Sequence, residues 1–376
     1  VRWESDVLGV RESRFTPPYR GADLTLVIRA LDVLQYPNYP NPETPGQRRR
    51  FTFGAEEQAR LAALGLWDAG RVRIDAHQRV GRALYRALAA DPAGAQALGT
   101  ARDHATASGQ DLALALRFPP GAVEIAALPW ELLWDDGPTP LLLSRGRLAG
   151  CARHLDLAEA LPPPRGRAGP LRILAIAPQA GIPEEVRAEE RAARHAAWQP
   201  LLERGQVVID EVRPATRRAL VDAIQAGPPP DIVHYYGHGR YAGGAGALLL
   251  DSPEADWSWT SASALVTLLG GVRLIALYAC QGAMVDDSPL GLLSGVAPAL
   301  SAAGAPLVIG MQLTTRIAAG TRASGVIYRA IVAGQSVQAA VGQARQALYV
   351  EEDDRTSWYV PALYIRSRDT GPAYLL

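Results

Sequence analysis

The sequence predicts a doubly wound α/β domain, with a mostly parallel six-stranded sheet flanked by helices, preceded by an α/β supporting region. After residue 170, apolar runs of strand length alternate with helical patterns, which is typical of a parallel sheet wrapped by helices. A segment rich in proline and glycine, LPPPRGRAGP, comes just before these runs. We therefore expect a supporting region at 1–160, a linker at 161–170 and a second domain at 171–376.

Six apolar runs rich in Val, Ile, Leu and Tyr carry the prediction of the sheet. They begin at Leu171, Val207, Asp231, Val272, Pro306 and Trp358. The helical patterns between them begin at Pro183, Thr216, Ser261 and Gly325. The uncharged stretch 288–315 is long enough to cross a bilayer, but prolines and glycines interrupt it. We expect a buried helix followed by a central strand in this stretch.

The supporting region has a mixed pattern without a repeat. Strand-like runs begin at Leu24 and Asp111, and a helical pattern begins at Asp75. The segment LPWELL at 128–133 follows these elements. An α/β or α+β unit fits this order.

The composition excludes several classes of function. The chain has no lysine, so its basic residues are all arginine, and a Walker-type phosphate loop and Schiff-base chemistry are both excluded. The 38 basic residues balance 38 acidic ones, which argues against a partner such as nucleic acid or an anionic membrane. Two cysteines in 376 residues form no disulfide framework, which favours the reducing cytoplasm. We expect no cofactor.

Two chemically active side chains lie where predicted strands end. His238 follows the third run in HYYGHG, and Cys280 ends the fourth in YACQG. The carboxyl ends of parallel strands meet at one edge of the sheet, where the active sites of doubly wound folds lie. A nearby imidazole lowers the pKa of a thiol and later protonates the leaving group. We predict that His238 and Cys280 are catalytic, and that the N–H groups of Gly239 and Cys280 form an oxyanion hole.

Two histidine spacings suggest metal sites, and neither fits well. His234 and His238 are four residues apart, as in a helical zinc pair, but they lie in a predicted strand and no third ligand is marked. We expect His234 to be structural. Cys151 and His154 form a C-x-x-H spacing that stands alone in the supporting region. We expect Cys151 to pack in the core and His154 to lie at the surface.

A dinucleotide-binding interpretation also begins from the same glycines. Gly237, Gly239 and Ala242 fit the loose pattern of that motif. The motif must open a helix, whereas the following GGAGALLLD is typical of a hairpin strand. We therefore reject this interpretation.

Several segments around the predicted dyad follow the order of one peptidase family. The ACQG at 279–282 is close to the caspase nucleophile signature, although Tyr278 stands where caspases carry glutamine. LPWELL lies upstream, and AGAPLVIGMQ at 303–312 lies downstream. The chain thus resembles the CHAT family of caspase-like cysteine peptidases of clan CD, relatives of caspases and separase. The resemblance covers roughly residues 75–367.

The resemblance implies a caspase-like catalytic (CHAT) domain at 171–376 and a pseudo-caspase-like supporting half at 1–160. It implies a cysteine endopeptidase that cleaves a protein substrate, with His238 as general base, Cys280 as nucleophile and Gly239 lending an oxyanion N–H. It also implies a regulated effector of a bacterial defence or signalling system, with a sensor module or partner protein. The alternative is a catalytically idle caspase-like scaffold or signal-binding adaptor.

The substrate-binding residues follow the family pattern less closely. Many CHAT sequences carry an acidic residue a few positions after the MQ pair, where this chain has LTTRIAAG. Asp286 and Asp287 after Cys280, or Asp251, could supply the negative floor that selects a basic P1 side chain. The alternative interpretation of Asp286 and Asp287 is a solvated helix N-cap before Ser288. The predicted substrate-binding residues are Asp251, Asp286, Asp287 and Gln312. Arg240 and Arg316 would instead favour an acidic P1 side chain.

Overall fold

The computed structural model of the chain describes most of the predicted second domain and parts of the supporting region. The described residues are 2–5, 9–12, 74–89, 99, 103, 107, 113–118, 129–143, 150–155, 164, 166–179, 182–242, 245–255, 257–285, 296–312, 317–351, 357–366 and 373–376. The strand predicted from Leu24 lies outside these residues. So do Asp286 and Asp287, and the side chain of Cys280.

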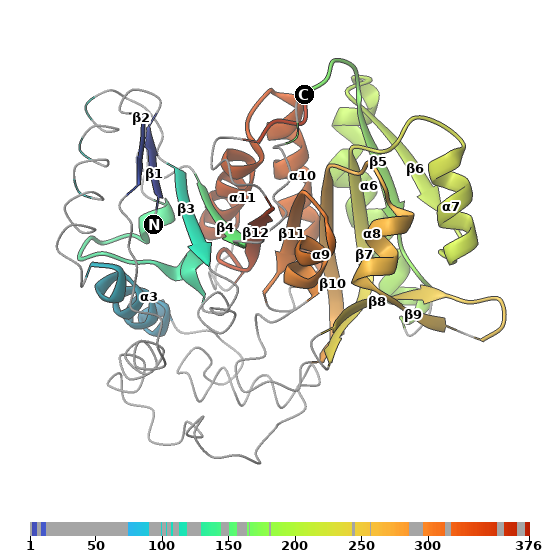
Figure 1. The fold of residues 1–376 in the computed structure, drawn as a ribbon, viewed down its shortest axis with the longest axis horizontal. Coiled ribbons are helices and arrows are strands. Elements are labelled where there is room, and N and C mark those ends of the chain that lie inside the picture. The colour runs from blue at the N-terminus through green and yellow to red at the C-terminus, as the bar shows by residue number, and fades with distance from the viewer. Residues whose placement is uncertain are drawn as a thin grey trace, which may run out of the picture.

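Twelve strands form one sheet in the part of the chain that the structure describes (Figure 1). They are β1 (Arg2–Ser5), β2 (Gly9–Glu12), β3 (Ala113–Phe118), β4 (Gly150–Leu155), β5 (Leu171–Ile176), β6 (Val207–Val212), β7 (Ile232–Ala242), β8 (Ala245–Asp251), β9 (Trp257–Ser261), β10 (Leu274–Val285), β11 (Leu307–Met311) and β12 (Pro361–Ile365). Their order is β2-β1-β3-β4-β12-β11-β10-β7-β5-β6, and β8 and β9 extend from β7.

The six strands predicted after residue 170 are β5, β6, β7, β10, β11 and β12. The first five run parallel to one another, and β12 pairs antiparallel with β11. The predicted doubly wound, mostly parallel sheet is therefore confirmed. Its inner strands read as nearly continuous apolar runs because both faces of the sheet are covered there, whereas β6 at the end of the sheet contains Asp210 and Glu211.

The sheet continues across the predicted linker. β4, from the supporting region, pairs parallel with β12, and β3 pairs parallel with β4. The border at 161–170 therefore separates two parts of one sheet. The division into two domains stays a prediction.

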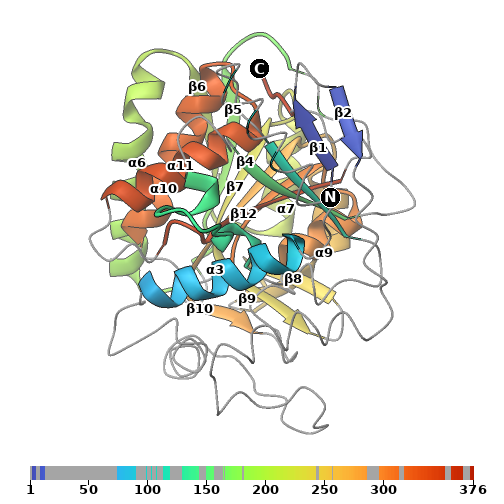
Figure 2. The ribbon, with the colours of Figure 1, turned by 90° about the vertical axis from the view of Figure 1, so that its left-hand side faces the viewer.

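Helices cover the two faces of the six-stranded part, as Figures 1 and 2 show together. On one face lie α6 (Glu184–Glu203), α10 (Ile317–Val332) and α11 (Val337–Glu351), and on the other lie α7 (Arg217–Gln225), α8 (Ala262–Leu268) and α9 (Val296–Ala303). The supporting region adds α3 (Ile74–Ala89) and the short 3-10 turns η1 (Trp130–Leu132) and η2 (Leu141–Leu143). Side chains alternate along each strand between the two cores, so Ile232 packs toward α6 and Val233 toward α9.

The stretch 288–315 contains a helix and then a central strand, as predicted. These are α9 and β11. A Cβ on Gly246 would lie 2.6 Å from the Cβ of Ala299, and one on Gly310 would lie 2.6 Å from the Cβ of Ala297. The glycines thus let α9 approach the strands closely. Among the described helices, none is both long enough and apolar enough to cross a bilayer.

Helix α10 begins at Ile317, well before the predicted start at Gly325. Gly320 and Gly325 weaken the helical signal of the sequence, because glycine is a poor helix former. Packing favours the helix here: a Cβ on Gly325 would lie 3.3 Å from the Cβ of Ala197 in α6. The close contact of α6 with α10 therefore outweighs the local propensity.

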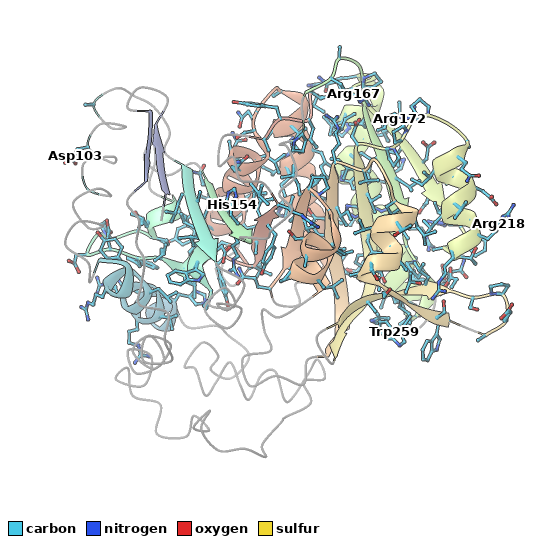
Figure 3. The ribbon with its side chains drawn as sticks, in the orientation of Figure 1. Asp103, His154, Arg167, Arg172, Arg218 and Trp259 are labelled. Carbon is cyan, nitrogen blue, oxygen red and sulfur yellow. The ribbon has the colours of Figure 1, made fainter. Side chains whose placement is uncertain are left out.

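The β8–β9 hairpin confirms the strand prediction for GGAGALLLD. β8 pairs antiparallel with β7 and with β9. The glycines of the dinucleotide pattern thus lie in a strand that leads to a hairpin, and not at the start of a helix. The hairpin carries Trp259, on the side of the molecule opposite Arg167 and Arg172 (Figure 3). Trp257 is 47% exposed.

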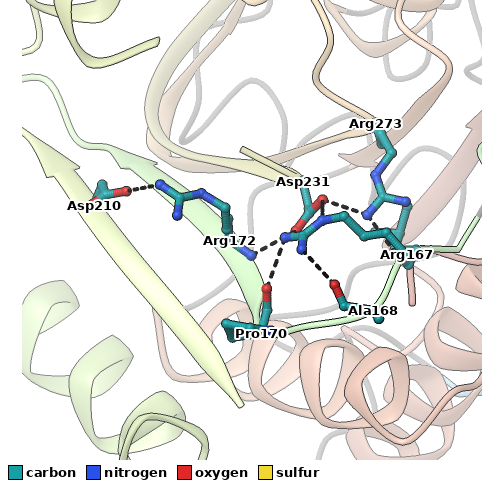
Figure 4. A network of polar contacts seen from close by, with 8 residues as sticks. Arg167, Ala168, Pro170, Arg172, Asp210, Asp231 and Arg273 are labelled. Atoms are coloured by element: carbon teal, nitrogen blue, oxygen red, sulfur yellow. Dashed lines mark hydrogen bonds and ion pairs between the residues drawn. The ribbon is translucent and has the colours of Figure 1, made fainter. Parts of the chain in front are cut away.

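The amino ends of β5, β7 and β10 meet at the buried carboxylate of Asp231 (Figure 4). Asp231 directly precedes β7, and Arg273 directly precedes β10. The guanidinium groups of Arg167 and Arg273 and the N–H of Arg172 in β5 all donate to the carboxylate. The N–H groups of Arg273 and Leu274 donate to the Asp231 carbonyl oxygen. These bonds fix the start of β7 against the start of β10.

The pKa of Asp231 reflects this network. Burial raises the pKa, but hydrogen bonds from Arg167, the Arg172 N–H and Arg273 outweigh burial and hold it below its usual value. The carboxylate is therefore charged at neutral pH, and its stabilising effect is lost as the pH falls through that lowered pKa.

Replacing the charge of Asp231 should destabilise the whole sheet. Asp231→Asn keeps the shape but removes the buried negative charge that faces Arg273 and Arg167, so we expect the free energy of unfolding to fall by about 3 kcal/mol. Urea unfolding measures the change. Asp210→Asn is the matched control, because Asp210 is 58% exposed and pairs with Arg172 at 3.4 Å. We expect the control to lose less than about 1 kcal/mol, and equal losses would contradict this role of Asp231.

Candidate active site

The predicted catalytic residues lie where the pairing of β7 with β10 changes register. The two strands pair regularly from Ile232 with Leu274 to Gly237 with Ala279. The next pair is Gly239 with Met284. Between these pairs β7 has one residue, His238, and β10 has the four residues 280–283. His238 and Cys280 are therefore the first residues of the two strands after the regular register ends.

The hydrogen bonds around Asp231 and the regular register that follows them place His238 and Cys280 at the same height along the two strands. His238 is seven residues after Asp231, and Cys280 is seven residues after Arg273. Neighbouring strands lie about 4.8 Å apart. An interruption of the regular pairing changes the direction of the side chains that follow it, and irregularities such as bulges are common beside active sites.

His238 is half-buried, and Gly239 beside it is buried. The carbonyl oxygen of His238 accepts a hydrogen bond from the Tyr235 hydroxyl at 2.7 Å. Gly239 pairs with Leu248 of β8 on its other side. A Cβ on Gly239 would lie 3.0 Å from Cγ2 of Val296, so glycine allows α9 to pack against the site.

His234 is a core residue, in agreement with its predicted structural role. It is 2% exposed, and its Nδ1 lies 2.8 Å from the Tyr328 hydroxyl oxygen. Its ring stacks on Tyr278 at 4.6 Å and meets the edge of Trp198 at 4.7 Å. Burial, and then the charge of Arg194, hold the pKa of His234 well below its usual value. The imidazole is therefore neutral and supports the strand beneath the candidate site.

Asp251 and Gln312, two of the predicted substrate-binding residues, have buried side chains. The carboxylate of Asp251 accepts hydrogen bonds from the N–H of Gln179 after β5 and the N–H of Ala215 after β6, both at 2.8 Å. It thus holds two loops at the carboxyl edge of the sheet. The predicted role of Asp251 in substrate binding stays a prediction, and so does that of Asp286 and Asp287, which lie outside the described residues.

Gln312, at the end of β11, belongs to a buried polar cluster around Glu131. Its amide nitrogen donates to Glu131 at 2.7 Å and to the Tyr359 carbonyl oxygen at 2.9 Å, and its amide oxygen accepts from Arg153 at 2.9 Å. Arg345 of α11 lies 3.7 Å from Glu131 and donates to the Pro361 carbonyl oxygen. These contacts give Gln312 a structural role, and its predicted substrate contact stays a prediction.

The charges of this cluster are fully buried. Glu131, Arg153 and Arg345 each have no exposed surface. Burial lowers the pKa of Arg153, but the charge of Glu131 outweighs it and raises the pKa above its usual value. Sequence reasoning missed this cluster, since its residues come from four separate segments. The one available signal was a glutamate inside the apolar segment LPWELLW.

The C-x-x-H residues of β4 are both buried. Cys151 has no exposed surface, and burial, followed by the charge of Glu131, raises the pKa of its thiol to about 12. His154 is 1% exposed, so the predicted surface position of His154 is wrong. The reason is that β4 lies inside the sheet, between β3 and β12 (Figure 3).

The mostly parallel sheet with helices on both faces is the fold class that the sequence predicts, and the main chains of His238 and Cys280 lie on two neighbouring strands of it. The CHAT domain family matches residues 78–369, and the chain belongs to this family of caspase-like proteases. Among solved structures, the chain is similar to Saccharomyces cerevisiae separase in its complex with securin, at 14% identity and a TM-score of 0.41. That match covers 92% of this chain and 22% of the separase chain. No curated sequence matches the chain.

Removing the charge of Glu131 should cost more stability than removing an exposed carboxylate. Glu131→Gln removes the negative charge that lies against the fully buried Arg153 and Arg345, and we expect a loss of about 3–5 kcal/mol in the free energy of unfolding. Thermal and urea unfolding measure it. Asp222→Asn, which removes the exposed partner of Arg218, is the control. Similar losses in the two variants would show that the buried charge of Glu131 contributes no more to stability than the exposed charge of Asp222.

The low pKa of His234 predicts acid sensitivity. Below about pH 6.5 the unfolded chain binds a proton at this histidine and the folded chain does not, so stability falls as the pH drops. The slope from this one group is at most about 1.4 kcal/mol per pH unit. Urea unfolding between pH 7 and about pH 5 should show a smaller slope for His234→Phe than for the wild type. Parallel curves would contradict a neutral, buried His234.

Proposed function

We propose that the chain is a cysteine endopeptidase in which His238 is the general base and Cys280 is the nucleophile. The observation that carries this proposal is the register of β7 and β10, which changes at these two residues. The main chains of both residues thus lie at the same level of adjacent parallel strands. The carboxyl edge of a doubly wound sheet is also where such folds place their chemistry.

The proposed reaction has two stages. The imidazole of His238 takes the thiol proton of Cys280, and the thiolate sulfur attacks the carbonyl carbon of the scissile peptide bond. The C–N bond breaks as the imidazolium gives its proton to the leaving amine. Water then attacks the thioester carbonyl carbon, with His238 accepting its proton. The C–S bond breaks, the imidazolium returns the proton to the sulfur, and the acid product and the free thiol result. The N–H groups of Gly239 and Cys280 would stabilise the tetrahedral oxyanion.

The second cysteine supports the assignment by contrast. Cys151 is fully buried and its pKa is about 12, so its thiol is uncharged at neutral pH. A thiolate is the reactive form of cysteine. Cys280 is therefore the one cysteine of the chain whose position suits nucleophilic catalysis.

The substrate and setting are proposed from the family resemblance. We expect a protein substrate, a cytoplasmic enzyme, and a role as a regulated effector in bacterial defence or signalling, switched by a sensor module or partner protein. A basic P1 side chain would fit Asp286 and Asp287 near Cys280 in sequence. Cleavage of a peptide library would reveal this preference directly.

Peptide cleavage should depend on both members of the dyad. Cys280→Ala removes the nucleophile and His238→Ala removes the base, so we expect each to lower cleavage of a proteome-derived peptide library by at least about 1,000-fold. Mass spectrometry of the new peptide termini measures it. Cys151→Ala is the matched control and should keep wild-type cleavage. Undiminished cleavage by Cys280→Ala would refute the assignment, and a wild-type Cys280 that no thiol-reactive peptide probe labels would favour the idle scaffold.

A further inference from the structure

The hydroxyl of Tyr235 lies between the main chain of the proposed base and the β8–β9 hairpin. Its oxygen is 2.7 Å from the carbonyl oxygen of His238 and 2.9 Å from that of Leu249 in β8. The side chain is 1% exposed. Burial raises the pKa of Tyr235 well above its usual value, so the hydroxyl keeps its proton and acts as a donor. Its single proton serves both carbonyl groups and holds them close together.

Gly237 is the residue that lets the Tyr235 ring reach this position. Residues 235 and 237 share a face of β7, because side chains alternate along a strand. A Cβ on Gly237 would lie 2.5 Å from the Tyr235 hydroxyl oxygen and 2.7 Å from its Cζ. Any side chain at 237 would therefore displace the ring from the two carbonyl groups.

The hydrogen bond from Tyr235 to His238 lies where the pairing of β7 with β10 is irregular. Gly237 pairs with Ala279 and Gly239 pairs with Met284, so the register changes at His238. A regular ladder fixes each residue through its neighbours in the next strand. The Tyr235 hydroxyl adds a further fixed point at the residue where the regular ladder with β10 stops.

We infer that Tyr235 is a positioning residue for His238, because its hydroxyl fixes the main chain of the base and joins it to the β8–β9 hairpin. The inference rests on the proposed function, in which His238 acts on Cys280. The same hydroxyl contact would allow the β8–β9 hairpin to regulate the site. A partner or substrate that moves the hairpin would move the base through the same hydroxyl.

The test uses the reactivity of Cys280, which needs no known substrate. Iodoacetamide alkylates the thiolate, and the buried, neutral Cys151 does not compete; Cys280→Ala gives the blank. The rate is measured from about pH 5 to pH 9, across the range where an ordinary thiol titrates near 8.5. Tyr235→Phe removes only the hydroxyl. Tyr364→Phe is the matched control, because Tyr364 is also buried and its hydroxyl accepts from Arg153 in another part of the sheet.

We expect Tyr235→Phe to slow alkylation at pH 7 by about tenfold and to move the pH midpoint toward that of His238→Ala. Tyr364→Phe should follow the wild type. A wild-type pH midpoint of alkylation below about 8.5 that rises in His238→Ala but stays unchanged in Tyr235→Phe would overturn the positioning role and leave the proposed dyad standing. A wild-type midpoint near 8.5 that His238→Ala does not change would overturn the dyad and the positioning role together.

A second measurement on the unmodified chain covers the case in which Tyr235→Phe does not fold. A buried hydroxyl proton held by two carbonyl groups exchanges slowly with water. Proton NMR of the wild-type chain should show a protected Tyr235 hydroxyl signal. Rapid exchange of this proton would overturn the inference.

Discussion

The pairing of Asp231 with Arg273 determines where the candidate active site forms. The two residues stand directly before β7 and β10, and their side chains and main chains are bonded to each other. From this point both strands run in regular register to Gly237 and Ala279. The chain therefore reaches the carboxyl edge with His238 and Cys280 at the same level. An interaction at one edge of the sheet thus sets the geometry of the other.

Burial keeps this register from slipping. A shift of one residue would exchange the two faces of a strand. Along β7, Ile232 and Tyr236 pack in one core, and Val233 and Tyr235 pack in the other. A slip would also take His234 out of its aromatic surroundings. Both cores thus support the position of His238, and the Tyr235 hydroxyl adds a hydrogen bond at the residue itself.

The sequence was sufficient for the six strands β5, β6, β7, β10, β11 and β12 and for the hairpin strand β8, but β7 and β10 run on past His238 and Cys280, so the predicted ends of these two strands are wrong. The confirmed strands depend on local patterns: apolar runs, turns and glycines. It was not sufficient for features that depend on packing between distant segments. Helix α10 extends past its glycines because α6 lies against it, and His154 is buried because β4 lies between β3 and β12. The cluster around Glu131 has the same cause, since Glu131 and Gln312 are 181 residues apart in sequence.

The level placement of His238 and Cys280 is the central claim, and a disulfide tests it most directly. Disulfides form between residues whose Cα atoms lie about 4.4–6.8 Å apart, which neighbouring strands satisfy at residues that lie side by side. Mild oxidation of a His238→Cys variant should join positions 238 and 280 within one chain, as peptide mapping by mass spectrometry would show. Cys151, which is buried, should stay reduced. If Cys280 remains a free thiol, or pairs only between chains, the two strands do not bring these residues together.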